Sequence, residues 1–424
     1  MQAVFFEYEL TPTTWACLSS LMTIGIYFKF RRFWSVRNLD IVALVSMVPG
    51  LLLVIRGGGG EQVGYTWLFV ASGFFMVRLL LDPIMVRRPL LEPNLSTDGL
   101  TFAAVALLVF LIANVATAPL TVSDLEGARR IDQLLDWEGR APGEMSKVTK
   151  RPGHPLFSIF ARFSNKMPLV TPDETDPQRY RRAEIRRAIT RIIAIFGHLA
   201  VVVGIVLIGV RHFDNVQTGI SAATLYLLYP YTAEMTEHVD HVVPAALLIW
   251  AVQTYRRPIV SGALIGLAIG LVYYPLFLLP LWCSFYWRRG LLRFSLGVVI
   301  SISILVASLA LTAGDLEMLF VQLQQMFGWG SISLEGVTGF WQYYEPAYRV
   351  PVIAAFLALC SSMALWPAQK NLGTLLSCSA AVMLGTQFWV YEEGGTYMAW
   401  YLPLLIVTIF RPNLEDRVAL ATVL

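Results

Sequence analysis

The stretch between residues 256 and 289 decides the architecture of this chain and reads RRPIVSGALIGLAIGLVYYPLFLLPLWCSFYWRR. Thirty uncharged residues, 258–287, separate its two arginine pairs. One straight helix of that length would measure about 45 Å, which exceeds a bilayer core of about 30 Å, and it would put the arginine pairs on opposite sides. Two short helices that fold back at Tyr273-Tyr274-Pro275 would put both pairs on one side. We therefore predict a hairpin.

The composition of the whole chain indicates a membrane protein. Its 424 residues are 56% hydrophobic and 14% charged, and the mean hydropathy is +0.60. Soluble proteins carry about 45–50% apolar and about 25% charged residues, so a large soluble globule is excluded, as is intrinsic disorder. The net charge of +3 gives no argument for nucleic-acid binding. The four cysteines lie in apolar stretches and form neither a disulfide framework nor a metal-ligand spacing.

Apolar runs of sufficient length predict an all-α, polytopic integral membrane protein with about 13 transmembrane segments. We expect residues 1–99 to form an N-terminal extension of three spans and residues 100–424 to form the core. The predicted spans are 13–30, 39–55, 65–81, 100–119, 192–210, 218–232, 242–255, the two halves of 258–287, 291–312, 351–367, 373–390 and 397–410.

The charges of the loops orient these spans. Fifteen basic residues fall in short loops on one side, against two on the other, Arg56 and Arg349. The positive-inside rule then predicts a plasma (inner) membrane protein with its N-terminus outside and its C-terminus in the cytoplasm. The basic loop 120–191 falls outside, since segments of that length translocate largely regardless of charge. The longer polar loops, 120–191 and 313–350, are extracytoplasmic, so we expect any chemistry at the outer face.

Nothing in the sequence indicates a nucleotide fold. The Gly57–Gly60 run follows a predicted span and lacks the strand and helix that surround a phosphate-binding loop, so it is interpreted as a turn. We expect no nucleotide cofactor.

The first candidate site follows the fourth span. Apolar residues recur at helical spacing through 123–135, which predicts an amphipathic helix along the outer interface. Its first turn holds Asp124, which suits catalysis close to the membrane surface. A structural role is the alternative, because Ser123 and Glu126 match a capping box and an acid favours the helix dipole.

The second candidate site is the acidic turn 234–241 at the end of the sixth span. Glu237 and His241 are spaced i,i+4, and His238 and His241 are spaced i,i+3, with Asp240 between them. Such a cluster suits a divalent cation or a phosphate group, and ionisable groups at membrane depth tend to be functional. The alternative is a solvated loop clear of the lipid headgroups.

Other outer residues suit a sugar or a lipid headgroup. Arg349, Glu392 and Glu393 carry charge in outer loops rich in aromatic residues, although aromatic residues also anchor spans at the interface. Tyr273 and Tyr274 at the hairpin apex could face the outer cavity or serve as such anchors. Packing roles are expected for His198 and for the small-residue repeat Gly262, Gly266 and Gly270.

The order of these features resembles the GT-C superfamily of membrane glycosyltransferases, and most closely the family 87 polyprenol-phosphate-mannose-dependent mannosyltransferases. The resemblance covers roughly residues 100–410. It rests on Asp124 soon after a span, the Gly-His-Pro-Leu-Phe element at Gly153–Phe157, Asp240 in the acidic turn, and the stretch Gly262–Pro280.

The resemblance implies an inverting hexosyltransferase that moves a sugar, mannose in the closest branch, from a polyprenyl-phosphate donor to a lipid or glycan acceptor. It implies that Asp124 activates the acceptor hydroxyl and that Asp240, with His238 and His241 nearby, binds a cation or the donor phosphate. The expected substrate-binding residues are Glu126, His154, Tyr273, Tyr274, Arg349, Glu392 and Glu393.

Two other classes of function stay open. A multi-span transporter or lipid flippase would fit the short helices and the hairpin, although we find no internal repeat and the acidic residues lie near span ends. A non-catalytic scaffold that keeps the fold is the third possibility.

Overall fold

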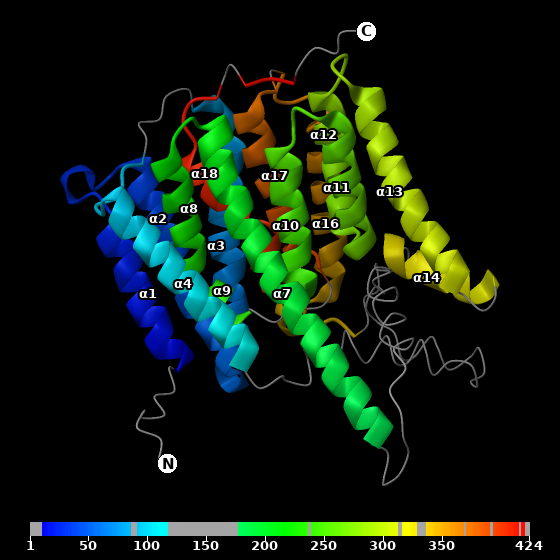
Figure 1. Ribbon diagram of the computed structural model, residues 1–424, viewed down its shortest axis with the longest axis horizontal. Coiled ribbons are helices and arrows are strands. Elements are labelled where there is room, and N and C mark those ends of the chain that lie inside the picture. Colours follow the sequence, from blue (N-terminus) through cyan, green and yellow to red (C-terminus); the bar gives the residue numbers. More distant parts are fainter. Residues whose placement is uncertain are drawn as a thin grey trace.

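A computed structural model describes residues 11–85, 91–117, 177–235, 239–312, 316–328, 336–368, 370–390, 393–414 and 417–419. Within these residues the chain is helical, and the one β-type pairing is an isolated bridge between Gly339 and Gly394. Most helices lie side by side in one bundle, and α14 lies crosswise beside the end of α13 (Figure 1). The predicted all-α class is confirmed for the part of the chain described.

The α-helices are α1 (Pro12–Tyr27), α2 (Val36–Arg56), α3 (Glu61–Leu81), α4 (Thr97–Thr117), α7 (Pro177–His212), α8 (Val216–Leu228), α9 (Pro230–Glu234), α10 (Val239–Gln253), α11 (Pro258–Leu271), α12 (Leu279–Phe285), α13 (Leu291–Thr312), α14 (Leu316–Phe327), α15 (Phe340–Tyr343), α16 (Arg349–Ser362), α17 (Leu372–Thr386) and α18 (Leu402–Phe410). The 3-10 helices are η1 (Phe30–Arg32), η2 (Gly58–Gly60), η3 (Asp82–Ile84), η6 (Tyr274–Leu278), η7 (Pro346–Tyr348) and η8 (Met398–Trp400).

Several helices begin where a polar side chain can cap their free backbone N–H groups. The Thr11 hydroxyl accepts from the N–H of Thr14 at the start of α1, and the Asn215 side chain accepts from that of Thr218 at the start of α8. Asn371 does the same for α17, at 2.9 Å from the nitrogen of Thr374. These caps satisfy donors that a helix leaves unpaired in its first turn.

Among the described residues, five helical segments are long and apolar enough to cross a membrane: Val36–Arg56, Gly58–Ile84, Thr97–Thr117, Arg191–His212 and Leu291–Leu311. Shorter apolar helices pack among them, and large apolar side chains such as Phe102 and Leu292 point outward from the bundle. An exposed apolar surface on long helices suits lipid rather than water. The structure supports a polytopic helical membrane protein.

The predicted hairpin is confirmed. Helix α11 ends at Leu271, η6 turns the chain, and α12 returns toward the end from which α11 started. The hydroxyl of Tyr286 donates to the carbonyl of Tyr255 at 2.6 Å, which puts the two arginine pairs at the same end of the bundle. We call this the arginine end.

The opposite end of the bundle carries the turns between the other helix ends, and we call it the loop end (Figure 1). It holds residues 57–61, 229–235, 239–241, 272–278, 336–349, 387–390 and 393–400. Hydrogen bonds join its segments: Tyr343 donates to Glu61 at 2.8 Å, and Trp341 donates to the carbonyl of Phe388 at 3.0 Å.

The predicted count of about 13 spans is not confirmed, since only five helices of the described residues are long enough to cross a membrane. Two of the differences from the predicted spans have a local cause. The expected span 218–232 divides into α8 and α9, because Pro230 holds Tyr229 in an extended conformation that ends the first helix. The expected loop 313–350 contains the amphipathic helix α14, which at 12 residues is shorter than a span. His198 is buried and bonds to the Tyr226 hydroxyl at 3.0 Å, as expected for a packed histidine.

Candidate functional site

The predicted site residues divide into those inside and those outside the described part of the chain. Asp124, Glu126, His154, His238 and Glu392 lie outside the described residues. Asp240, His241, Tyr273, Tyr274, Arg349 and Glu393 are described, and each belongs to a segment of the loop end. The site is therefore built from this second group.

Asp240 and His241 stand in the first turn of α10, which begins at Val239. An acidic residue there is favoured by the helix dipole, and the backbone carbonyl of Asp240 accepts the indole N–H of Trp400 at 3.0 Å. His241 is only 5% exposed, and its Nδ1 lies 2.7 Å from the hydroxyl of Tyr231. The pair thus presents one half-buried carboxylate next to a buried, oriented imidazole.

Aromatic rings connect this turn to the hairpin apex. The ring of His241 lies 4.7 Å from that of Tyr397, which stacks on Trp400 at 4.4 Å between ring centroids. Trp400 in turn lies 4.9 Å from Tyr274, and Tyr274 lies 4.1 Å from Tyr273. The structure therefore brings the acidic turn and the two apex tyrosines into one continuous aromatic cluster.

Arg349 joins the same cluster from α16. Its side chain is 1% exposed, and its Nε and Nη2 donate to the backbone carbonyl of Trp389 at 3.1 and 2.9 Å. The Trp389 ring lies 5.5 Å from that of Tyr274. A buried guanidinium thus stands behind the tryptophan that contacts the hairpin apex, which places a permanent positive charge at this end of the bundle.

Trp389 is a site residue that the sequence analysis missed. Its indole nitrogen is buried and has no hydrogen-bond partner among the described residues. Buried indole N–H groups ordinarily find an acceptor, so an orphaned donor in an aromatic cluster suits a bound oxygen atom. Its position two residues before Tyr391-Glu392-Glu393 was the available signal, but aromatic residues near span ends are equally well explained as interfacial anchors.

Glu393 lies in a turn that the backbone holds tightly. The residue has a positive φ of 46°, and its N–H donates to the Thr338 hydroxyl at 3.1 Å. The side chain of Gln387 accepts from the N–H groups of Gly395 and Tyr397, both at 3.2 Å. The turn fixes the position of Tyr397 against His241. Glu393 therefore lies in the segment that holds the aromatic cluster in place.

Of the three predicted metal ligands, Asp240 and His241 lie in the described part of the chain and His238 lies outside it. Asp240 and His241 are adjacent, and no group of three or more His, Cys, Asp or Glu side chains forms within the described ranges. The Nδ1 atom of His241 is engaged by Tyr231. A cation here would need further ligands beyond this pair, since the common sites use four or more.

Helix α4, which precedes Asp124 in the sequence, ends beside the same turn. Val115 near the end of α4 shares a buried cluster with Ala194 of α7 and Val239, the first residue of α10. The side chain of Asn114 donates to the carbonyl of Ala233 at 3.2 Å. Next to that carbonyl, burial raises the pKa of Glu234, so the acid is protonated more readily than a solvated one.

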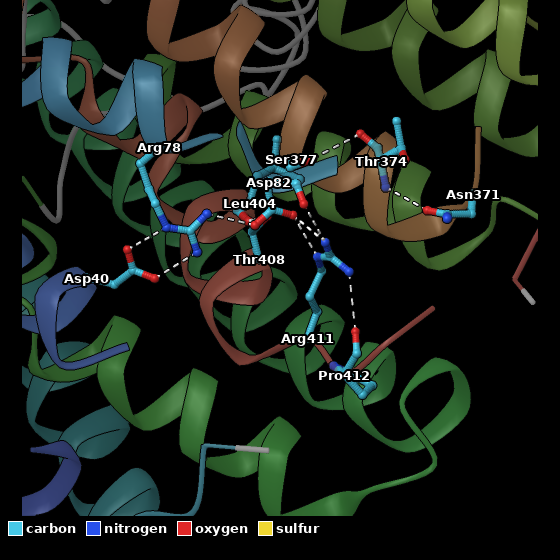
Figure 2. Close-up of polar contacts among 10 residues, drawn as sticks. All are labelled: Asp40, Arg78, Asp82, Asn371, Thr374, Ser377, Leu404, Thr408, Arg411 and Pro412. Carbon is cyan, nitrogen blue, oxygen red and sulfur yellow. Dashed lines mark hydrogen bonds and ion pairs between the residues drawn. The ribbon is translucent and has the colours of Figure 1, made fainter. Parts of the chain in front are cut away.

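A second cluster of ionisable groups lies at the arginine end and was not anticipated (Figure 2). Arg78 of α3 binds both oxygens of Asp40 at 2.8 and 2.9 Å and one oxygen of Asp82 at 2.8 Å. Arg411, which follows α18, pairs with the other Asp82 oxygen. We call these four buried residues the charged chain. Two acids and two arginines balance, so the arrangement suits a structural clamp between three helices.

Comparisons of the sequence and the structure with protein-family models, curated proteins and solved structures gave no match.

Proposed function

We propose that the protein is an inverting membrane glycosyltransferase that moves a sugar from a polyprenyl-phosphate donor to an acceptor hydroxyl at the loop end. The observation that carries the proposal is the continuous cluster from His241 through Tyr397, Trp400 and Tyr274 to Trp389. Aromatic faces are suited to the apolar face of a sugar ring, and the orphaned indole N–H of Trp389 offers a donor to a hydroxyl or phosphate oxygen.

The proposal assigns the loop end to the extracytoplasmic side and the arginine end to the cytoplasm. Lys29, Arg31, Arg256, Arg289 and Arg411 all belong to segments at the arginine end. This distribution is the one expected from the positive-inside rule for a protein of about 13 spans in the plasma membrane, with its N-terminus outside.

The proposed reaction uses Asp124 as general base. The acceptor oxygen bonds to the anomeric carbon, the bond between that carbon and the donor phosphate breaks, and the phosphate leaves with the electron pair. The carboxylate of Asp124 takes the acceptor proton, a step of the kind that contributes about 10²–10⁴-fold to rate. Charge on the leaving phosphate would be stabilised by Arg349, or by a cation held at Asp240 and His241.

The covalent chain allows Asp124 to reach this site. Asp124 stands seven positions after Thr117, the last residue of α4, so it lies within about 25 Å of that helix end at full extension. The end of α4 is itself packed beside the first residue of α10. A carboxylate from the loop can therefore meet the Asp240–His241 pair.

The experiment is a transfer assay with purified protein, labelled polyprenyl-phosphate-mannose and candidate lipid or glycan acceptors. Asp124→Asn should lower transfer by about 10²-fold or more, because an amide cannot accept the proton. Asp132→Asn, in the same segment, is the matched control and should transfer normally.

Full activity in the folded Asp124→Asn protein would refute the assignment of the base. Movement of a labelled lipid across vesicles by the wild-type protein, with no glycosylated product from any acceptor, would instead support the transporter or flippase.

A further inference from the structure

A pocket of about 920 Å³ opens at the arginine end, far along the bundle from the aromatic cluster. Helix α12 and the turn after it form one wall, and residues 364–368, 370 and 371 with Val418 form the other. Its size lies within the range of about 300–1,000 Å³ that is typical of ligand sites. The lining residues are Pro280, Cys283, Ser284, Phe285, Trp287, Arg289, Ala364, Leu365, Ala368, Lys370, Asn371 and Val418.

Hydrogen bonds hold the walls of the pocket together. The Ser284 hydroxyl donates to the carbonyl of Ala364 at 2.5 Å, which joins α12 to the opposite segment. Arg289 donates to the carbonyl of Ala419 at 3.2 Å, and Asn371 caps α17. The pocket is thus a built feature of the packed helices rather than a gap between loose loops.

The charge of the pocket is positive. Arg289 and Lys370 line it, and the described lining residues include no acid. Lys370 uses two of its three N–H donors on the carbonyls of Ala364 and Pro367, at 3.3 and 3.0 Å. Burial lowers the pKa of Lys370, because the ammonium has lost part of its hydration. A bound anion would compensate for that loss.

The rim of the pocket is apolar and faces outward. Trp287 is 62% exposed and Leu365 is 84% exposed, and both lie among the lining residues. Exposed tryptophan beside basic residues at a helix end is typical of the membrane–water interface. A ligand that fits must therefore combine an anionic head with an apolar body.

We propose that this pocket binds the phosphodiester headgroup of an anionic phospholipid. Arg289 and Lys370 contact the phosphate, and the acyl chains leave past Trp287 and Leu365 into the bilayer. Anionic lipids are enriched in the cytoplasmic leaflet, where basic pockets between helices bind their headgroups. The proposed orientation puts the arginine end, and with it this pocket, on that side. The site does not depend on the transfer reaction, because it lies at the other end of the bundle.

The test uses the full-length protein in a neutral detergent and measures thermal stabilisation as lipid is added. Phosphatidylglycerol should stabilise the wild-type protein with a saturable midpoint, whereas phosphatidylcholine should not. Glycerol 3-phosphate separates the two sources of the phosphate: if it stabilises as well as the lipid at equal concentration, the pocket binds a soluble anion and the lipid assignment is wrong.

The variant Arg289→Gln with Lys370→Met removes both cations and should weaken the response to phosphatidylglycerol at least about tenfold. The matched control, Arg257→Gln with Arg293→Gln, removes two exposed cations at the same end that do not line the pocket, and should respond like wild type. Equal weakening in both variants would show general surface attraction and would overturn the proposal.

A third variant covers the case in which the double substitution fails to fold. Ala368→Trp keeps both cations but fills the pocket from an exposed position of its wall, and should also lose the response. An unchanged midpoint in folded Ala368→Trp protein would place the lipid elsewhere and refute the site.

Discussion

Arg78 shows at the scale of one residue how this fold tolerates charge inside an apolar bundle. Its guanidinium makes three hydrogen bonds to two carboxylates, and all the residues of the charged chain are buried. A buried ion pair adds little stability compared with an apolar pair of the same shape, but removal of one partner leaves an uncompensated charge. The position is therefore sensitive to changes that break the balance.

We expect Arg78→Met to lower the stability of the purified protein by about 3–5 kcal/mol, measured as thermal unfolding in detergent. Asp40→Asn combined with Arg78→Met should recover part of this loss, since the pair of Asp82 and Arg411 remains balanced. If the double variant is less stable than Arg78→Met alone, the charged chain does not contribute to stability through charge balance.

Glu234 gives a prediction about pH. Burial raises the pKa of this acid above its ordinary 4.5 in the folded protein, so the folded state holds the proton more tightly than the unfolded state. Ionisation then opposes folding, and the effect develops as pH rises from 4.5 through the raised pKa. Glu234→Gln should match wild type in melting temperature near pH 4 and exceed it at pH 7. A difference that does not change with pH would contradict this.

At the scale of elements, the packing of α11 against α13 depends on residues without a side chain. A Cβ atom on Gly262 would lie 2.1 Å from the carbonyl oxygen of Phe294, and one on Gly297 would lie 2.1 Å from that of Ile259. Both neighbours are backbone atoms, which cannot turn away. The close approach confirms the packing role predicted for the Gly262–Gly270 repeat.

Gly262→Ala should therefore separate the two helices and destabilise the protein by about 1–3 kcal/mol, seen as a lower melting temperature and poorer expression. Gly73→Ala in α3 is the control, because a Cβ atom there meets nothing within 4 Å. A wild-type melting temperature in Gly262→Ala would show that α11 and α13 can shift at no cost.

Sequence patterns predicted elements best where charge marks their ends. The arginine pairs around 258–287 and the Tyr273-Tyr274-Pro275 apex are local signals, and they located the hairpin. The division of 218–232 into α8 and α9 depends on Pro230, a signal that hydropathy averaged over a span conceals. Helix α14 is amphipathic and has only 12 residues, so it was not predicted as a span.

At the scale of the whole molecule, the site could be predicted only in part. Asp240, Tyr273, Tyr274 and Arg349 could be proposed from the sequence because their residue types are conspicuous at span ends. Their shared cluster depends on contacts such as Trp400 to Asp240, 160 residues apart in sequence, and on Trp389 behind them. The charged chain spans 329 residues between Asp82 and Arg411, and no local pattern indicates which distant arginine meets a given acid.

The orientation of the bundle can be tested with single cysteines in a background that lacks Cys17 and Cys283, the two that are not fully buried. Gly59→Cys lies in an open turn at the loop end, and Trp34→Cys lies at the arginine end, where Trp34 is 81% exposed. On intact cells an impermeant maleimide should label only Gly59→Cys, and Trp34→Cys should react after permeabilisation. The reverse pattern would invert the proposed topology.

The charged chain also bears on where the molecule can be cut. Residues 1–99 form an extension in the sequence prediction, yet Arg411 finds its carboxylate in Asp82 of that extension. The hydroxyl of Tyr27 likewise donates to the carbonyl of Ser221, and that of Tyr229 to the carbonyl of Leu44. A shortened chain starting at residue 100 would leave the buried guanidinium of Arg411 without its carboxylate partner. Any minimal protein should therefore retain the first three helices. Chimaeras should exchange these helices together with α18.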